Sequence, residues 1–461
     1  MTSGPRKLTL FTLLWPILGE QVLHVAVQTV DTFMVSHVSD DAVGALGMSG
    51  SVVWVAITFF FFIGIGASIV ITHHLGAKDR AGADRIAVAA ISANTWIGLV
   101  VSLSLFLLAR PLLELLHMPA QQIPLAMRFL PLMGGTLFLE AQNIAMGAVL
   151  RAHGHTKDPM WVTAVQNGLN VAGNCLLLFG LLGFPKLGVT GVAISGVVSR
   201  IISFAIFWVL VKRRTQIRLR AGDYFRLPVR EIARVLRIGG PSAGENLLWN
   251  VAFLTVQSFV ARMGATPLNT QSYVMQLSMW IIQFGISVGI ANEILVGHHV
   301  GAGRFQEAYS EALRSLRVAF LMVCAVVVPV AIFAPFLLRP FTQDPEIIRM
   351  GTILLRLGLL LETGRVFNIV LVMSLRATGD SLFPFFMGIA SMWCVWVPLA
   401  WLLGLSLELA LPGVWISMMT DEWTRAGVFY RRWKKRTWLT HAHRSRADAK
   451  ESISELAAVG P

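Results

Sequence analysis

The chain has 461 residues, of which 55% are hydrophobic and only 14% are charged, and its mean hydropathy is +0.66. A soluble domain carries about 25% charged residues, so this composition excludes an ordinary soluble protein and indicates an integral membrane protein. Lys and Arg (38) outnumber Asp and Glu (25), for a net charge of +13. Because the basic residues stand in short stretches between apolar segments, they report membrane topology, and we expect no nucleic-acid partner.

Twelve apolar runs are long enough to cross about 30 Å of hydrocarbon, a distance that takes about 20 helical residues. In chain order they cover residues 8–34, 42–72, 86–109, 124–150, 159–182, 189–211, 238–261, 272–296, 318–338, 347–375, 383–405 and 411–430. The sequence therefore predicts an all-α integral membrane protein with twelve transmembrane helices.

The distribution of positive charge between the twelve runs predicts the orientation of the chain. When alternate loops are assigned to opposite sides, 28 Lys and Arg residues fall on the side of the N-terminus and 6 on the other side, while four lie within or close to the spans. Cytoplasmic loops carry the excess of Lys and Arg. We therefore expect a multi-pass protein of the inner (plasma) membrane with both termini in the cytoplasm.

The second half of the chain repeats the first. A shift of 225 residues places the block 73–77 on 298–302, the Leu-Arg-Ala-x-Gly motif at 150–154 on 375–379, and Pro16, Gly19 and Glu20 on Pro241, Gly244 and Glu245. One offset that serves blocks so far apart indicates a duplication. Each copy holds six crossings, so the two pseudo-symmetric six-helix bundles are parallel repeats with the same orientation.

The repeat also divides the chain into parts. We predict an N-lobe over residues 1–211 with helices 1 to 6, and a C-lobe over 237–436 with helices 7 to 12. Between them, residues 212–236 form a basic cytoplasmic linker. Residues 437–461 form a polar cytoplasmic tail that we expect to be mobile.

Three groups of residues resemble the multidrug and toxic compound extrusion (MATE) family. They are the segment from Trp15-Pro16 to Val30-Asp31-Thr32-Phe33-Met34, the sequence Gly44-Ala45-Leu46-Gly47, and the repeated Leu-Arg-Ala-x-Gly motif. The similarity extends over nearly the whole chain, from about residue 8 to 436.

This resemblance implies an exporter, not an enzyme, with two bundles facing each other across a central cavity. It would expel cationic or amphipathic compounds in exchange for Na⁺ or H⁺ by alternating access. The expected partners are a small-molecule, cationic substrate and membrane lipid, with the protein acting as a monomer. No cofactor is expected apart from the coupling ion.

The family's cation site in the first lobe resembles Asp31 with Asn170 and Asn174 of this chain. Many relatives carry Asp where this chain has Asn174. Some relatives have a buried Glu where Trp249 stands, and a buried Asp where Arg365 stands. These departures leave the choice between Na⁺ and H⁺ open, as well as the charge of the substrate.

Four polar residues share a narrow face of the first helix, namely Glu20, His24, Gln28 and Asp31. At about 100° per residue they fall within about 80° of one another. A charge facing lipid is costly, so this face must line a cavity or meet polar partners. Our hypothesis makes Asp31 the main cation or proton site, with Asn170 and Asn174 as neutral oxygen donors and Glu20 as a second carboxylate. The alternative is that Asp31 is merely solvated near the outer mouth.

A second polar stripe lies on the seventh predicted helix, where Glu245 is the repeat equivalent of Glu20. Asn246 and Asn250 lie within about 40° of each other on the same helix. One hypothesis places these residues in the substrate cavity, with Glu245 attracting a cationic substrate or titrating during turnover. The other makes Glu245 a protonated carboxyl that is bonded within its own lobe.

Four further charged residues lie about 15 to 18 Å from the cytoplasmic helix ends, near the bilayer centre. They are Glu140 and Arg200 in the first copy, and Arg365 and Glu422 in the second. We predict buried ion pairs of Glu140 with Arg200 and of Arg365 with Glu422. The competing partner for Arg365 is Glu362, three residues earlier on the same helix.

No metal centre or nucleotide site is predicted. The His-His pairs at 73 and 298 point about 100° apart on a helix, and no acidic cluster accompanies them. The three cysteines lack metal-type spacing, and no phosphate-binding Gly-rich Lys motif is present.

Two other functions compete with drug export. A lipid-linked oligosaccharide flippase of the wider superfamily would favour a strongly cationic cavity, whereas the candidate residues of the first helix are acidic. An intramembrane enzyme would need a paired acid and base, for which His24 beside Glu20 is the one weak candidate.

Overall fold

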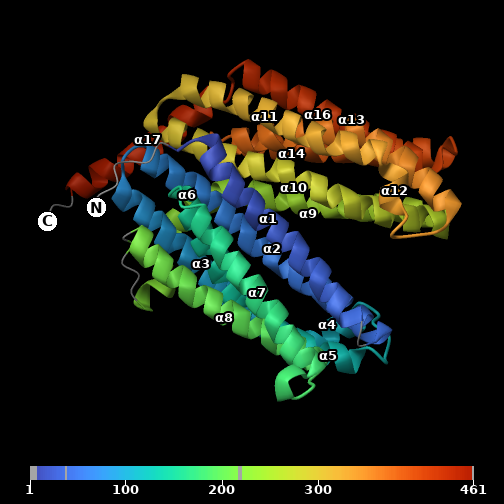
Figure 1. The fold of residues 1–461 in the computed structure, drawn as a ribbon. Helices are drawn as coiled ribbons and strands as arrows, with labels where there is room; N and C mark the ends of the chain where they lie inside the picture. The colour runs from blue at the N-terminus through green and yellow to red at the C-terminus, as the bar shows by residue number, and fades with distance from the viewer. Residues whose placement is uncertain (1–7, 37–38, 216, 218–220, 459–461) are drawn as a thin grey trace. The chain divides into compact units, whose positions relative to one another are not determined.

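The computed structural model describes residues 8–36, 39–215, 217 and 221–458, and within these ranges every regular element is a helix (Figure 1). Two arginines of the predicted linker, Arg218 and Arg220, lie outside the described residues, as do both termini. The orientation of the termini therefore stays a prediction.

In the described part of its first half, the chain forms eight α-helices and two short 3₁₀ turns. They are α1 (Leu10–Ser36), α2 (Asp40–Gly76), α3 (Arg80–Leu107), α4 (Ala109–Leu115), α5 (Ile123–Gly135), α6 (Leu137–Ala152), α7 (Lys157–Phe179), η1 (Leu181–Gly183), α8 (Val189–Arg214) and η2 (Ala221–Tyr224).

Up to residue 458, the last one that the structure describes, the second half forms nine α-helices and two π-helical stretches. They are α9 (Val229–Arg262), α10 (Ala265–Ala302), α11 (Phe305–Ile332), α12 (Ala334–Leu338), α13 (Pro345–Ala377), α14 (Leu382–Ser391), η3 (Met392–Trp396), α15 (Val397–Trp401), η4 (Leu402–Ser406), α16 (Ala410–Lys434) and α17 (Leu439–Ala458).

Each of the twelve predicted runs overlaps helical structure. In the described part of the chain, eight helical stretches are long and apolar enough to cross a membrane, and α5 with α6 makes a ninth if the pair counts as one span. Helices α7, α9 and α16 are long, with 23, 34 and 25 residues, but they are more polar. Their polar residues include the asparagines of α7 and the buried acids of α16, which are candidates for functional side chains.

The run predicted over residues 124–150 is not a single straight helix. It breaks into α5 and α6, whose axes meet at 44°. Pro131 lies inside α5, and Gly134 and Gly135 end it. Proline removes one backbone hydrogen bond and glycine lowers helix propensity, so the bend falls where the sequence supports the helix least.

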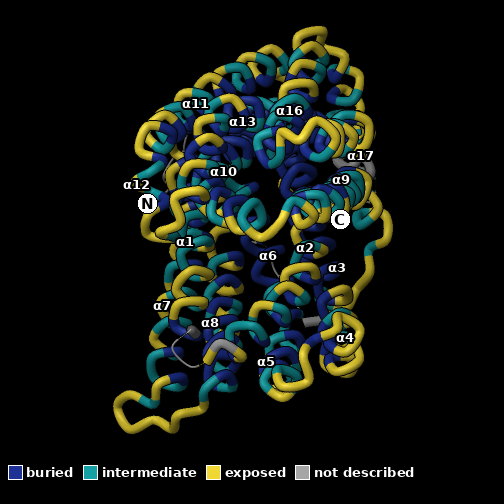
Figure 2. Tube along the Cα trace, turned by 90° about the vertical axis from the view of Figure 1, so that its right-hand side faces the viewer, coloured by how far each residue is buried: buried dark blue, intermediate teal, exposed yellow. Residues whose placement is uncertain are grey.

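The helices gather into two compact units. One comprises Met1–Leu18, Gly76–Lys78 and Pro241–Pro461, and the other comprises Gly19–Leu75 and Asp79–Gly240. The start of α1, up to Leu18, belongs to the same unit as the second half of the chain, whereas the sequence placed it in the N-lobe. Its buried side chains, such as Leu14 and Ile17, share a core with residues of α10, α11 and α13. Figure 2 shows buried and exposed residues alternating along the helices, with the connecting loops mainly exposed.

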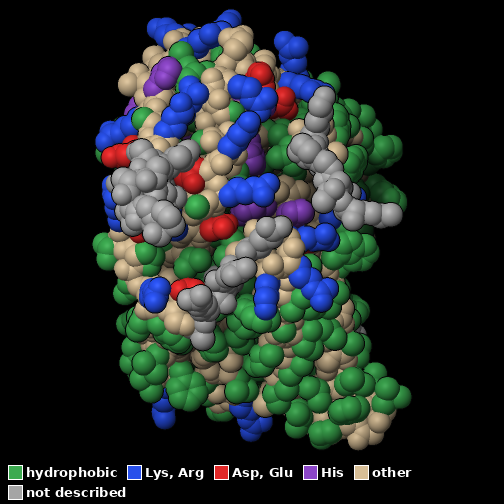
Figure 3. Space-filling model, turned by 90° about the vertical axis from the view of Figure 1, so that its left-hand side faces the viewer, with side chains coloured by type: hydrophobic (Ala, Val, Ile, Leu, Met, Phe, Trp, Pro, Cys, Tyr) green, Lys and Arg blue, Asp and Glu red, His purple; other side chains and the backbone are tan. Residues whose placement is uncertain are grey.

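The predicted polar tail is helical over residues 439–458, where it forms α17. Trp438 and Ala442 are fully buried, and the Trp438 ring stacks on Trp433 with centroids 4.6 Å apart. The Ser445 hydroxyl also donates to the Thr378 carbonyl at 3.3 Å. The apolar side chains spaced along this polar sequence give it a face that packs. Figure 3 shows Lys and Arg side chains gathered on the face of the molecule that carries α17.

Candidate functional site

A row of asparagines on α7 holds this helix against α1. Asn167, Asn170 and Asn174 follow the spacing i, i+3, i+7, which places them on one face of the helix. The Asn167 amide donates to the Leu23 carbonyl of α1 at 2.8 Å. Sequence reasoning missed Asn167, although its spacing from the other two asparagines was the signal that could have found it.

Asp31 meets the far end of this row. Asn174 Nδ2 lies 2.8 Å from Asp31 Oδ1 and 3.2 Å from Asn170 Oδ1, so its amide donates toward both oxygens. Asn174 is 0% exposed. Asp31 is half-buried in the last turns of α1. The structure thus brings together Asp31, Asn170 and Asn174, three of the four residues that sequence reasoning assigned to the coupling site.

One oxygen of this group has no donor. Asn174 Oδ1 is buried and accepts no hydrogen bond from the described residues. A buried acceptor without a partner is unfavourable, and a carboxylate with neutral amide oxygens is a donor set suited to a hard cation or a proton. A cation beside Asp31, or a proton carried by it, would fit this arrangement.

Glu20 does not join the Asp31 group. Its Oε1 lies 2.7 Å from Arg151 Nη1, and the Glu20 side chain is only 6% exposed. Arg151 stands in the last turn of α6, where the helix dipole also favours a positive charge. The hypothesis of Glu20 as a second coupling carboxylate is not supported by this geometry, because its charge is already matched.

Glu245 is held in the same way in the second half. Its Oε2 lies 2.6 Å from Arg376 Nη2, and the two side chains are 13% and 8% exposed. Arg376 stands in the last turn of α13. The Glu245 carboxyl is therefore bonded within its own half of the chain, as the second hypothesis predicted. That hypothesis did not name a partner, and the structure shows that the partner is Arg376.

The two Glu–Arg pairs were not predicted, although the repeat contained the signal. A shift of 225 residues maps Glu20 onto Glu245 and Arg151 onto Arg376 at once. In each copy the residue before the glutamate is glycine. A Cβ on Gly244 would meet the Phe385 ring at 2.6 Å. Glycine thus allows the close approach of α14 that lies beside the pair.

The remaining candidates of the two polar stripes are exposed. His24 and Gln28 lie exposed on α1. Asn246 and Asn250 lie exposed on α9, where their amides donate back to the carbonyls of Ser242 and Asn246 at 2.9 and 2.8 Å. These four residues form no common cluster with Asp31 or Glu245 by any contact of the described side chains. Their assignment to a substrate cavity stays a prediction.

The structure brings Glu140 and Arg200 together. Arg200 Nε lies 3.3 Å from Glu140 Oε2, and the side chains are 7% and 17% exposed. Arg200 also donates to the Met133 carbonyl at 2.9 Å. Because Met133 lies in α5 and Glu140 in α6, this arginine on α8 bridges both sides of the bend.

In the second half, Arg365 contacts both of its proposed partners. Arg365 Nη1 lies 2.7 Å from Glu362 Oε1, and its Nε lies 3.4 Å from Glu422 Oε1. Sequence reasoning missed two further members of this network, Asp421 and Arg425, which are 2.6 Å apart. Their spacing of four residues on one helix face was the available signal. The buried network thus has three acids and two bases.

His74 and His153, near the ends of α2 and α6, have local hydrogen-bond partners. His74 Nδ1 lies 2.8 Å from Asp79 Oδ2, and Asp79 Oδ1 caps α3 by accepting from the Gly82 amide at 2.9 Å. Burial lowers the pKa of His153, just after α6, so this imidazole is neutral near pH 7. Among the described residues, no group of three or more His, Cys, Asp or Glu side chains is placed to hold a metal ion.

Comparison with known proteins identifies relatives over most of the chain. The family model described as MatE matches residues 16–176 and 241–402, so the two matches begin 225 residues apart and reproduce the repeat. The chain is 38% identical over 434 residues to the protein named "Uncharacterized transporter YisQ" from Bacillus subtilis (strain 168), covering 94% of this chain and 95% of the relative.

Two further comparisons agree with this match. "Probable multidrug resistance protein NorM" from Thermotoga maritima is 26% identical over 442 residues, covering 94% of each chain. The solved structure described as "Crystal structure of MATE in the bent conformation" superposes with a TM-score of 0.86 at 21% identity. It covers 95% of this chain and 96% of that one. At this identity the structure establishes the shared fold alone.

Proposed function

Because this chain belongs to the MATE family of membrane transporters, we propose that it is a secondary active exporter. It would expel organic cations or amphipathic toxic compounds by alternating access, in exchange for Na⁺ or H⁺. The all-helical, two-repeat membrane fold supports this proposal, since repeats of this kind are common in secondary transporters. We further propose that the protein resides in the plasma membrane with both termini in the cytoplasm, and that it acts as a monomer.

The observation that carries the coupling mechanism is the Asp31 group. The half-buried Asp31 carboxylate lies 2.8 Å from an amide whose own oxygen is buried without a donor among the described residues. Binding a cation or proton removes the cost of that carboxylate's charge. Such a site can exist in two states of different charge, which is what an exchanger needs if an ion gradient is to drive export.

Glu20 and Glu245 take a different part in this mechanism. Each is paired with an arginine at 2.7 or 2.6 Å. We assign these pairs to holding the helix that contains Pro16 or Pro241 against the end of α6 or α13. Breaking a buried pair leaves one charge uncompensated. Asp31 is therefore the residue of the first helix whose charge remains available for coupling.

Transport assays on the Asp31→Asn variant test this proposal. Purified protein in liposomes would be given Na⁺ and pH gradients that are imposed independently, with a panel of fluorescent organic cations as substrates. We expect the unsubstituted protein to move substrate under one of the gradients, and Asp31→Asn to lose that gradient dependence. Export by Asp31→Asn with unchanged dependence on both gradients would refute the coupling role.

The matched control is Asp41→Asn. Asp41 is an exposed residue near the start of α2, where its Oδ1 accepts from the Gln122 amide at 3.3 Å. The substitution makes the same chemical change outside the apolar part of the helices. We expect this control to retain gradient-driven export.

A further inference from the structure

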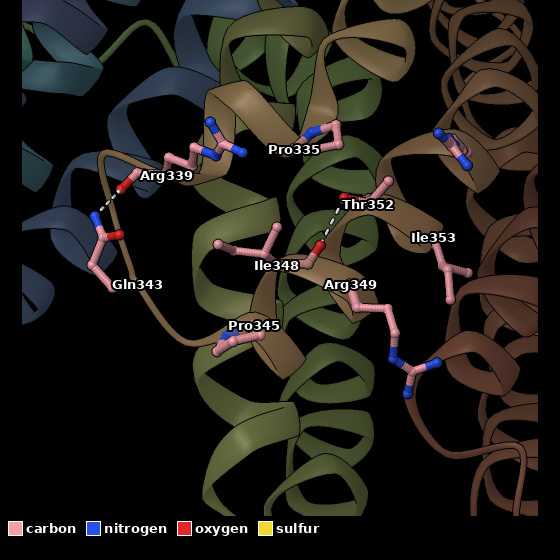
Figure 4. Close-up of a pocket in the computed structure, with 9 residues that line it drawn as sticks. Pro335, Arg339, Gln343, Pro345, Ile348, Arg349, Thr352 and Ile353 are labelled. Atoms are coloured by element: carbon pink, nitrogen blue, oxygen red, sulfur yellow. Dashed lines mark hydrogen bonds between the residues drawn. The ribbon is translucent and has the colours of Figure 1, made fainter.

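Beyond the residues discussed so far, a groove lies between α12 and the start of α13, within one compact unit. Its volume is about 430 Å³, and its lining includes Arg339, Arg349, Arg356, Gln343, Ile348 and Thr352. Figure 4 shows Arg339 and Arg349 on either side of Ile348. The three arginines are exposed. The groove therefore presents guanidinium groups along an accessible surface.

The arginines of the groove form no salt bridge with any described carboxylate. Arg349 and Arg356 are seven residues apart, so they lie on the same face of α13, two turns and about 10 Å from each other. The acids at this end of the helix are Asp344 and Glu346, and Asp344 is used to cap α13 by accepting from the Glu346 amide at 2.8 Å. Three arginines and two acids at this end of α13 give the groove and its surroundings a net positive charge.

The groove lies at the membrane face opposite to the linker. The spans α9, α10 and α11 alternate in direction, so α13 begins on the face opposite to the linker and ends on the linker's face. Arg356 precedes Arg376, in the last turn of α13, by 20 residues or about 30 Å, which is one hydrocarbon thickness. This depth places the arginines among the lipid headgroups of that leaflet.

The surroundings of the groove are apolar and exposed. Phe333 and Phe336 are 60% and 69% exposed beside Arg339, and Ile353 and Leu360 are exposed along α13. Long arginine side chains near a membrane surface lay their methylene groups on such apolar side chains and keep the guanidinium at the headgroup level. Acyl chains can therefore run along the same surface that places a phosphate at the arginines.

We propose that this groove binds the phosphate headgroup of an anionic phospholipid in the leaflet opposite to the linker. The planar guanidinium binds phosphate oxygens through two parallel hydrogen bonds, which suits it better than lysine to this task. The face opposite to the linker carries only 6 Lys and Arg residues outside the spans, and Arg339 and Arg349 are two of these. A cluster here is therefore not part of the general positive charge that sets topology.

Lipid titration of the full chain in a neutral detergent tests the proposal. Binding of phosphatidylglycerol and phosphatidylcholine is measured by native mass spectrometry, and the unfolding midpoint is followed in parallel. A basic residue near an anionic surface contributes about fivefold in affinity. We therefore expect Arg349→Gln combined with Arg356→Gln to weaken phosphatidylglycerol binding by about 25-fold, with phosphatidylcholine binding unchanged.

The matched control is Arg262→Gln, at the exposed end of α9 on the same membrane face. Its phosphatidylglycerol affinity should stay within twofold of the unsubstituted protein. Equal affinity of the double variant and this control would overturn the proposal. So would displacement of phosphatidylglycerol by millimolar inorganic phosphate, which would make the groove a site for a free anion. If the double variant does not purify, unchanged affinity in each single variant would count equally against it.

Discussion

The Glu20–Arg151 pair allows a quantitative test of how its two charges are stabilised. Substitution of Arg151 by Met keeps an unbranched, flexible stem without the guanidinium and leaves the Glu20 carboxylate buried, with its side chain 6% exposed. Removing one partner of a buried pair typically costs about 3 to 5 kcal/mol. For a unit of 150 to 250 residues, each kcal/mol lowers the unfolding midpoint by about 2 to 4 °C. We therefore expect Arg151→Met to lower the midpoint by about 6 to 20 °C.

The reverse substitution should cost less. Glu20→Gln leaves Arg151, whose side chain is 17% exposed and lies at the end of α6, where water and the helix dipole still stabilise its charge. Losing a hydrogen bond to a charged group costs about 1.5 to 3 kcal/mol. The double variant removes both charges and should recover most of the stability lost in Arg151→Met.

Fluorescence-detected thermal unfolding in detergent would measure all three variants on the same day and in the same buffer. The reasoning is refuted if the two single variants lose equal stability, or if the double variant is no more stable than Arg151→Met. In the second copy the exposed fractions are reversed, with Arg376 at 8% and Glu245 at 13%. There we expect the two single substitutions to differ less, and this difference between the copies is a further check.

Three other predictions follow from single contacts. Gly191→Ala should destabilise the protein by about 1 to 3 kcal/mol, because its Cβ would meet the Leu177 carbonyl oxygen at 2.6 Å. Gly168→Ala, inside α7 and with nothing within 4 Å, should instead leave the midpoint unchanged or raise it, because alanine is favoured over glycine by up to about 1 kcal/mol in a helix. Trp438→Ala should cost about 3 to 5 kcal/mol by emptying the core under α17, and an unchanged midpoint would contradict the packing of that helix. Asn174→Asp places a second carboxylate at the coupling site, where two adjacent acids retain a proton more readily. Its pH profile of export should move to higher pH, and an unshifted profile would argue against coupling there.

Much of the fold could be predicted because each span follows from local composition. Runs of about 20 apolar residues, the excess of Lys and Arg on one side, and the offset of 225 are properties of the sequence alone. The bend between α5 and α6 and the packed helix α17 were not predicted. Pro131 and the glycines at the end of α5 mark where a bend can form. Whether the chain bends there, and whether α17 packs, depends on tertiary contacts such as that of Arg200 with the Met133 carbonyl and the stacking of Trp438.

The candidate site was predicted only in part, and the reason is geometric. Helical periodicity determines which side of α1 carries Glu20 and Asp31, but it does not determine which neighbouring helix each residue meets. Asp31 could be matched to Asn174 through the family resemblance. Glu20 pairs with Arg151, which sequence reasoning had treated as part of a repeated motif and not as a partner for a buried acid. Residues that recur together under the repeat offset are therefore candidates for contact as well as for alignment.

The separation of the paired residues along the chain has a consequence for biogenesis. In both copies the glutamate precedes its arginine by 131 residues. At about 5 to 20 residues per second, a ribosome needs roughly 7 to 26 s to make that stretch. Throughout this interval the nascent first helix carries a carboxyl group whose counter-charge has not yet been synthesised. The helix must therefore wait in a hydrated compartment of the insertion machinery, or enter the lipid protonated, until α6 arrives.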